Sequence, residues 1–186
     1  MSIKIIIGPM FSGKTTALLD AIEKYKQISK RIIAINHSSD TRYGSNYLCT
    51  HDGLKVACLM RFELMGFLDT PCYNDADVII IDEGQFYPDC REFCLIASER
   101  DGKDIVVAAL NGDYMRQAFS SVSSLLPIAT DIQFTKALCM VCKDGTPGIF
   151  SKRIVDIKSI NYIGGSESYI TVCRKHFCQS NQDARV

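Results

Sequence analysis

Eight residues near the start of the chain have the types and the spacing of a phosphate-binding loop. They fit the pattern G-x-x-x-x-G-K-[ST] and are Gly8, Pro9, Met10, Phe11, Ser12, Gly13, Lys14 and Thr15. In such a loop the glycines let backbone N–H groups turn toward phosphate oxygens, Lys14 brings a positive charge, and the Thr15 hydroxyl can bind magnesium. An ordinary glycine-rich turn is the alternative, but a predicted strand before the loop and a predicted helix after it favour a nucleotide site.

Two neighbouring carboxylates follow a short apolar segment and can complete that nucleotide site. Residues 78–81 are all apolar and predict a buried strand, which delivers Asp82 and Glu83 to the sheet edge where ligands of open α/β folds bind. Adjacent residues of an extended chain point in opposite directions, so one acid can hold the magnesium shell while the other faces a nucleophile. A solvated strand end that carries acids is the alternative, which the phosphate loop makes less favoured.

Two pairs of metal-type ligands lie near the C-terminal end of the chain. Two residues separate Cys139 from Cys142, and two residues separate Cys173 from His176. Residues 143–172 lie between the two pairs. This arrangement resembles a zinc ribbon, and four filled positions would make the zinc structural because no position remains for water. A redox dithiol and unligated thiols are the alternatives, and Cys178 is a second candidate for the fourth ligand.

The elements that must position these residues follow an alternating pattern. Short apolar segments predict strands at 3–7, 31–36, 77–82 and 104–110. Helical periodicity covers residues 14–28 and 91–100. Near-continuous apolar strands that alternate with helices predict an α/β fold, with a mostly parallel sheet and helices on both faces.

The chain changes character after about residue 136, where helical periodicity fades. We therefore expect a P-loop α/β nucleotide-binding domain at 1–136 and a small zinc-ribbon-like domain at 137–186, which ends in a polar tail. Within the second domain, residues 153–160 alternate loosely like a strand before Gly164 and Gly165 interrupt the pattern.

Composition and charge exclude several classes of protein. The chain has 186 residues, with 47% apolar residues, so a sizeable core can form. Its 21 basic residues balance its 21 acidic residues, which argues against a partner that is nucleic acid. No apolar run approaches the roughly 18–20 residues that would span a membrane. The nine cysteines, without an export signal, favour a reducing compartment, and we expect a cytoplasmic protein.

Taken together, these residues resemble those of the type II, zinc-containing thymidine kinases, from about Ile3 to His176. Besides the phosphate loop and the cysteine pairs, several segments occur in the family's order: Asp40-Thr41-Arg42-Tyr43, Thr50-His51-Asp52, Asp82-Glu83-Gly84-Gln85-Phe86, Ala108-Ala109-Leu110-Asn111-Gly112, Ile163-Gly164-Gly165-Ser166-Glu167-Ser168-Tyr169 and Val172-Cys173-Arg174.

The resemblance implies transfer of the ATP γ-phosphoryl group to the 5′-hydroxyl of thymidine or deoxyuridine, for deoxynucleoside salvage. It assigns Glu83 as the base, while Lys14, Thr15 with magnesium, and Asp82 serve the phosphates. Arg42 matches an arginine near the phosphates. The residues that it places around the nucleoside are Met10, Asp40, Phe86, Leu110, Tyr114 and Phe119, although Leu110 and Phe119 taken singly look like ordinary core residues. The segment between Cys142 and Cys173 is implied to fold over the substrate as a lasso, with backbone groups near Ser151, Ile160 and Gly164 at the base edge. Tyr169 matches a tyrosine at the sugar or lid.

The resemblance also implies a homotetramer and inhibition by thymidine triphosphate. Three positions depart from the family's pattern: His176 stands where many relatives carry cysteine, Tyr114 where phenylalanine is common, and Asn111 where aspartate is often found. Two alternatives remain. A nucleic-acid-dependent ATPase with a zinc ribbon would hydrolyse ATP when DNA or RNA is added, and a non-catalytic module would bind nucleotide without turnover.

Overall fold

A six-stranded parallel sheet forms the centre of the protein in our computed structural model, which describes residues 1–40, 46–50, 53–157, 159 and 162–179. The strand order is β5-β2-β6-β7-β1-β8, and each neighbouring pair is parallel. The strands are β1 (Ser2–Gly8), β2 (Ile32–His37), β5 (Leu59–Arg61), β6 (Val78–Ile81), β7 (Asp104–Leu110) and β8 (Asp131–Phe134). The prediction of a mostly parallel sheet is confirmed, although the short strands β5 and β8 were not foreseen.

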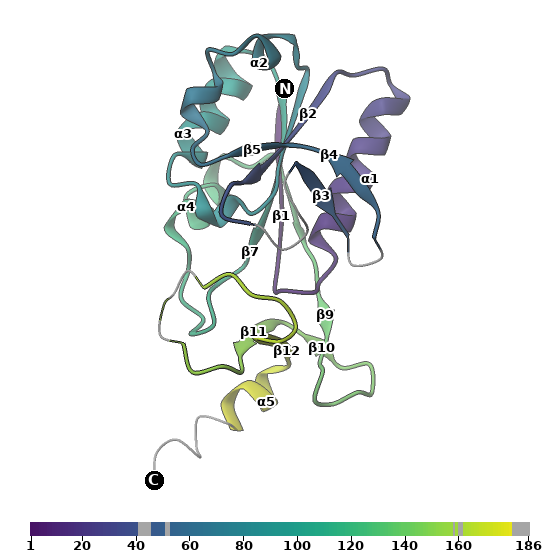
Figure 1. Ribbon diagram of the computed structural model, residues 1–186, viewed down its shortest axis with the longest axis vertical. Helices are drawn as coiled ribbons and strands as arrows, with labels where there is room; N and C mark the ends of the chain where they lie inside the picture. Colours follow the sequence, from purple (N-terminus) through teal and green to yellow (C-terminus); the bar gives the residue numbers. More distant parts are fainter. Residues whose placement is uncertain (41–45, 51–52, 158, 160–161, 180–186) are drawn as a thin grey trace.

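Helices lie on both faces of this sheet (Figure 1). One face carries α1 (Lys14–Gln27) together with the hairpin of β3 (Tyr47–Cys49) and β4 (Lys55–Ala57). The other side carries α2 (Pro71–Asp75), α3 (Cys90–Leu95), which continues as the π-helical turn η3 (Ile96–Arg100), and α4 (Ser120–Ser123). Single 3-10 turns are η1 (Met65–Phe67), η2 (Gly84–Phe86) and η4 (Leu126–Ile128).

Strand β6 shows why the apolar segments are unbroken. Its residues Ile79 and Ile81 pack with Phe93 of α3, whereas Val78 and Ile80 pack on the opposite face with Leu18 of α1. Both faces of each central strand are therefore buried, which is typical of parallel sheets. Because burial of one such side chain contributes roughly 1.5–3 kcal/mol, this sheet is a firm support for the loops at its carboxyl edge.

The chain beyond Lys136 forms a second, smaller part, which we call the ribbon region (137–179). It contains two antiparallel pairs, β9 (Ala137–Leu138) with β10 (Pro147–Gly148) and β11 (Phe150–Arg153) with β12 (Tyr169–Val172), followed by α5 (Arg174–Gln179). Its apolar cluster is small and centres on Cys139, Val172 and Phe177. Figure 1 shows this region below the carboxyl edge of the sheet.

The predicted strand at 153–160 is wrong. Strand β11 ends at Arg153, and Ile154 to Ile157 are not in a strand, while residues 158 and 160 lie outside the described part. Residues 154–157, 159 and 162–168 instead lie between β11 and β12 without forming a strand, and we call these described residues the 154–168 loop. The N–H of Ile154 donates to the carbonyl oxygen of Ser168 at 2.9 Å across the neck of this loop. The apolar alternation resembled a strand, but none of the described strands pairs with these residues.

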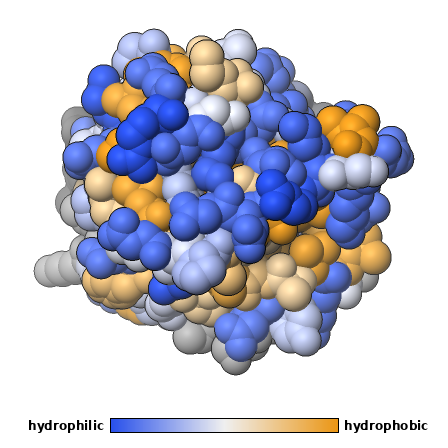
Figure 2. Space-filling view, turned by 90° about the horizontal axis from the view of Figure 1, so that it is seen from above, coloured by the Kyte–Doolittle hydropathy of each residue, from blue (hydrophilic) through white to orange (hydrophobic). Residues whose placement is uncertain are grey.

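The opposite end of the sheet, seen from above in Figure 2, is mostly hydrophilic with separate apolar spots. A shallow depression of about 510 Å³ near the amino end of β7 is lined by polar groups that pair with one another, such as Tyr73 with Asp101. The phosphate loop lies at the other edge of the sheet. Among the described residues, no helix has both the length and the apolar character needed to cross a membrane.

Candidate functional site

The phosphate loop connects the end of β1 to the start of α1 in a tightly defined shape. A Cβ atom at Gly8 would overlap with the side chain and backbone of Thr135, and Gly13 has a left-handed φ of 78°. Phe11 also has a positive φ, 59°, which non-glycine residues adopt at a cost. The Ser12 hydroxyl and the Lys14 ammonium both donate to the carbonyl oxygen of Pro9 at 2.8 Å. Internal hydrogen bonds and close packing therefore fix the shape of the loop.

Asp82 lies beside the start of α1, where magnesium would be needed. The Thr15 hydroxyl donates to Asp82 Oδ2 at 3.2 Å, although 67 positions separate these residues in the chain. Asp82 is only 6% exposed. A hydroxyl and a carboxylate at this distance, next to a phosphate loop, are oxygen ligands of the kind that magnesium prefers. The structure thus brings together the two residues for which the sequence predicted a magnesium role.

Glu83 does not continue the strand, so the expectation of two acids on an extended segment is wrong. β6 ends at Ile81, and Glu83 has a left-handed φ of 55°. Its N–H donates to Asp82 Oδ1 at 2.9 Å, which ties the two acids into a turn. Gly84 follows because a Cβ there would lie 2.6 Å from a Val107 methyl carbon. A sharp turn, rather than the strand pleat, therefore separates the two acids.

Gln85 holds the Glu83 carboxylate in place, a role that the sequence analysis missed. Its side-chain amide donates to Glu83 Oε2, and its side-chain oxygen accepts from the N–H of Leu110 at 2.9 Å. Its backbone carbonyl accepts from the Ser121 hydroxyl at 3.0 Å. Gln85 is 7% exposed, so these bonds are shielded from water. Only its place in the Asp82-to-Phe86 motif pointed to it.

A second missed residue, His37, lies at the end of β2 among aromatic rings. Its ring centroid is 5.2 Å from that of Phe62, 5.3 Å from Phe86 and 4.9 Å from Tyr87. Burial lowers the pKa of His37, and the nearby charges of Glu83 and Asp40 oppose this shift only in part. His37 Nδ1 accepts from the N–H of Ser39 at 3.2 Å, consistent with a neutral ring.

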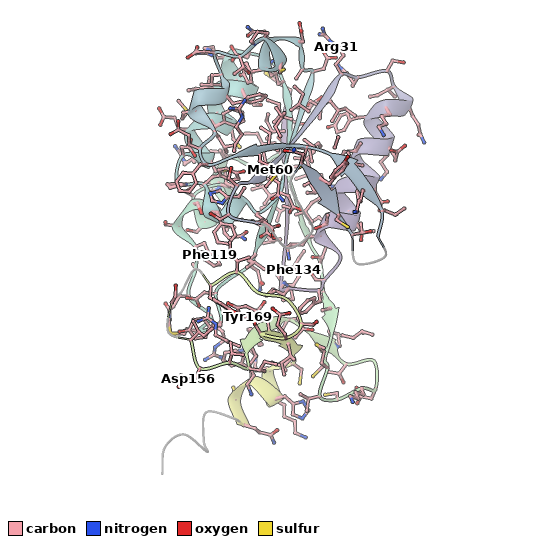
Figure 3. All side chains as sticks on the ribbon, viewed as in Figure 1. Arg31, Met60, Phe119, Phe134, Asp156 and Tyr169 are labelled. Carbon is pink, nitrogen blue, oxygen red and sulfur yellow. The ribbon has the colours of Figure 1, made fainter. Side chains whose placement is uncertain are left out.

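The residues predicted around the nucleoside occupy several segments near this edge. Asp40 is buried after β2 and accepts from the Asn36 amide at 3.3 Å, Phe86 ends η2, Leu110 ends β7, and Phe119 precedes α4. Figure 3 places Phe119 and Tyr169 where the sheet meets the ribbon region, and Arg31 at the far end. Arg42 and Ile160 lie outside the described residues, as do the other motif residues at 41, 43, 51 and 52.

Two hydrogen bonds join the phosphate-loop edge of the sheet to the ribbon region. The N–H of Met10 donates to the Ser151 hydroxyl at 2.9 Å, and the side chain of Asn111 donates to the carbonyl of Ile149 at 3.3 Å. Ser151 is thus fixed by its side chain, whereas the expectation concerned its backbone. Asn111, whose consequence was unassigned from sequence, anchors the chain just before β11. Gly164 is buried in the 154–168 loop, where a Cβ would lie 2.7 Å from Ser168.

The cysteine and histidine pairs converge on one point, as their spacing predicted. The ligand atoms of Cys139, Cys142, Cys173 and His176 all lie within 4.8 Å of one another. The sulfurs of Cys142 and Cys173 are 3.8 Å apart, and His176 Nδ1 is 3.3 to 3.6 Å from the three sulfurs. Tetrahedral zinc with Zn–S bonds of about 2.3 Å needs sulfur separations near these values.

The surroundings of Cys139 favour a metal-binding thiolate. Burial alone would raise the pKa of this thiol, but N–H groups of Cys142 and Cys173 donate to its sulfur and, with His176, lower that pKa to about 6. Cys178 is exposed on α5 and is not part of the group. The set of three cysteines and one histidine is therefore compatible with zinc, and no position is left for a substrate.

Comparison with known proteins gives a consistent result. The family model described as thymidine kinase matches residues 1–177. A thymidine kinase from Oryza sativa subsp. japonica is 42% identical over 94% of this chain, and one from Rabbit fibroma virus (strain Kasza) is 40% identical over 93%. One from Vaccinia virus (strain Western Reserve) is 40% identical over 96%. The chain spans 65% of the length of the rice protein and 94% and 97% of the viral proteins.

Proposed function

Because the chain belongs to the thymidine kinase family of enzymes, we propose that it transfers the γ-phosphoryl group of ATP to the 5′-hydroxyl of thymidine, and also of deoxyuridine. The products are the nucleoside 5′-monophosphate and ADP, as deoxynucleoside salvage requires. The observation that carries this proposal is the group formed by Thr15, Asp82 and Glu83 at the mouth of the phosphate loop.

The phosphate loop and its neighbours bind the triphosphate. Backbone N–H groups from Phe11 to Thr15 face the phosphate oxygens, and Lys14 exchanges its bond to Pro9 for the outer phosphates. Thr15 and Asp82 would hold magnesium, which would supply positive charge beside the phosphates. Arg42 adds a further positive charge near the transferred group.

Glu83 acts as the base. Its carboxylate takes the proton of the 5′-hydroxyl while that oxygen bonds to the γ-phosphorus and the bond from this phosphorus to the leaving ADP oxygen breaks. Gln85 supports this role, because its amide keeps the Glu83 carboxylate in one orientation. Phosphoryl transfer depends mainly on position and charge, so a fixed carboxylate suits it well.

The nucleoside occupies the space between the carboxyl edge of the sheet and the ribbon region. We assign its contacts to Met10, Asp40, Phe86, Leu110, Tyr114 and Phe119 from the first domain and to Ser151, Ile160, Gly164 and Tyr169 from the lasso. Apolar and aromatic walls suit a planar pyrimidine with a methyl group. Zinc at Cys139, Cys142, Cys173 and His176 anchors both ends of the lasso and takes no part in the chemistry.

The wider assignments extend the same proposal. We assign residues 1–136 to the nucleotide-binding domain and 137–186 to the zinc-binding lid, in a cytoplasmic homotetramer inhibited by thymidine triphosphate. The relatives' names support the kinase activity, while these finer features rest on resemblance to the family.

A nucleoside panel tests the proposal. Purified protein with ATP and magnesium is given thymidine, deoxyuridine, deoxycytidine or no nucleoside, and the monophosphates are measured beside ATP hydrolysis. We expect thymidine 5′-monophosphate, and hydrolysis that DNA or RNA does not stimulate. Hydrolysis stimulated by nucleic acid without nucleoside phosphorylation would instead support the ATPase alternative.

A further inference from the structure

Arg153, the last residue of β11, makes an unusually dense set of contacts outside the groups assigned above. Its Nε and Nη2 donate to the hydroxyl of Tyr169 at 3.1 and 2.6 Å, and that hydroxyl donates to the carbonyl of Tyr162 at 2.7 Å. A tyrosine hydroxyl that accepts twice and donates once has its hydrogen-bonding capacity filled. Tyr169 is 6% exposed, so its ring and hydroxyl are held firmly.

The same guanidinium also holds the 154–168 loop. Its Nη1 donates to the carbonyl oxygens of Ile157 at 2.6 Å and Ser159 at 2.7 Å. Bonds from a charged donor are stronger than those between neutral groups, and the planar fork of arginine can reach several acceptors together. Arg153 therefore binds β12 and the loop that precedes it into one unit.

The third contact of Arg153 reaches the part of the protein that contains the six-stranded sheet, which we call the sheet domain. Its guanidinium carbon lies 3.8 Å from the ring centroid of Tyr114, in the segment that follows β7. This is a close stacked cation–π contact. One side chain thus connects Tyr114 with Tyr169, which come from separate parts of the protein and which we have both placed beside the nucleoside.

We propose that Arg153 is a positioning residue for the nucleoside, which fixes Tyr114, Tyr169 and the loop carbonyls in their binding arrangement. The inference rests on the proposed function and adds a residue to its nucleoside site. The partners of Arg153 named above are Tyr114, Tyr169 and the loop carbonyls, so its loss affects nucleoside binding more than ATP binding. Pre-organised contacts bind more tightly because less freedom is lost on binding.

Steady-state kinetics of three variants test this inference. Arg153→Met keeps much of the side-chain length but removes the charge and the donors, and Arg153→Lys keeps the charge without the fork. Lys152→Met is the matched control, because it removes a charge from the next residue, whose side chain points to the opposite face of β11. We expect Arg153→Met to raise KM for thymidine about tenfold and KM for ATP less than about twofold, with little recovery in Arg153→Lys.

A second measurement separates positioning from general loss of structure. Amide hydrogen exchange and zinc content are measured on the same proteins without substrate. We expect faster exchange in residues 154–168 of Arg153→Met, with unchanged exchange in β1, β6 and β7 and unchanged zinc. Tyr169→Phe combined with Arg153→Met is expected to raise KM by less than the product of the two single effects, because they share one contact.

The outcomes are distinct. An active wild-type protein whose KM values for thymidine and ATP rise equally in Arg153→Met, or rise in neither case, overturns the inference alone. Loss of zinc from Arg153→Met also overturns it, since the residue would then be structural. Absence of thymidine phosphorylation by the wild-type protein overturns the proposed function, and this inference with it.

Discussion

In the sheet domain the proposed catalytic groups follow strands that are buried on both faces, whereas in the ribbon region the proposed nucleoside contacts depend on a few polar side chains and a metal-type cluster. Asp82 and Glu83 follow β6, whose four residues are each fully buried. Among the described residues of the ribbon region the apolar cluster around Val172 is small, and Arg153 donates to two carbonyl oxygens of the 154–168 loop.

This difference predicts how each region responds to mutation. In the sheet domain a site side chain can be removed while a large core keeps the backbone in place. Activity should then be lost while stability is retained. In the ribbon region a single zinc ligand or the side chain of Arg153 holds much of the structure in place. Local structure and nucleoside binding should therefore be lost together.

Lys14→Met is expected to have the largest effect. It should lower kcat/KM for phosphoryl transfer by about 1,000-fold, because the positive charge of Lys14 beside the transferred phosphate is lost. The melting temperature should remain within about 2 °C of wild type, since the core is untouched. Kinetics and calorimetry measure both quantities, with exposed Lys24→Met on the same helix as control. A large fall in the melting temperature of Lys14→Met would contradict the expectation that a site side chain of the sheet domain can be removed without loss of stability.

Removal of the zinc ligand in Cys173→Ser is expected to lower kcat/KM for thymidine about 100-fold, because both ends of the lasso lose their anchor. Amide exchange should rise throughout 137–179 but not in β1 or β7. Exposed Cys178→Ser is the control, and it should retain zinc and activity. Equal zinc content in Cys173→Ser and wild type would contradict the proposed ligand set.

Gly84→Ala tests the turn that carries Glu83. Its new Cβ would lie 2.6 Å from a Val107 methyl carbon and 3.3 Å from the Ala108 carbonyl oxygen, so the turn must shift. We expect a loss of about 1–3 kcal/mol in the free energy of unfolding, as is usual for overpacking, together with reduced kcat. Denaturant titration measures the first quantity. Gly66→Ala is the control, because its nearest neighbour is the flexible end of Glu63; an equal loss there would argue against a special constraint at Gly84.

His37 should give the smallest effect, a pH dependence of stability. Its ordinary pKa is 6.5, and burial lowers that value in the native protein. As the pH falls through 6.5, the unfolded chain takes up a proton that the native chain resists, so stability declines on the acidic side. Melting temperatures from pH 7.5 to 5 should fall less steeply in His37→Asn than in wild type. A steeper decline in the variant would show that His37 is protonated in the native protein.

The sequence was sufficient to predict the sheet, the phosphate loop and the metal-type cluster, because each depends on local pattern or fixed spacing. Residues 78–81 indicate a buried strand by themselves, and the spacing of Cys139 and Cys142 already indicates a metal knuckle. The convergence of Thr15 with Asp82 also followed, since parallel strands end at a common edge.

Other features depend on partners that sequence spacing does not reveal. The side-chain oxygen of Gln85 accepts from the N–H of Leu110, and Arg153 contacts Tyr114 and Tyr169. Only the folded chain brings these residues together. The left-handed turn at Glu83 has no local signal apart from the glycine that follows it. The 153–160 segment has the alternation of a strand, but its chain turns into a loop whose carbonyls bind an arginine.

We propose above all that this chain phosphorylates thymidine with Glu83 as the base. The most direct test is a single-turnover assay of labelled phosphate transfer from ATP to thymidine by the wild-type protein, Glu83→Gln, and the exposed control Glu92→Gln. We predict that Glu83→Gln transfers phosphate about 100- to 10,000-fold more slowly while ATP binding and melting temperature are retained, and that Glu92→Gln matches wild type. Transfer at the wild-type rate by Glu83→Gln would contradict the role of Glu83, and absence of transfer by the wild-type protein would contradict the claim as a whole.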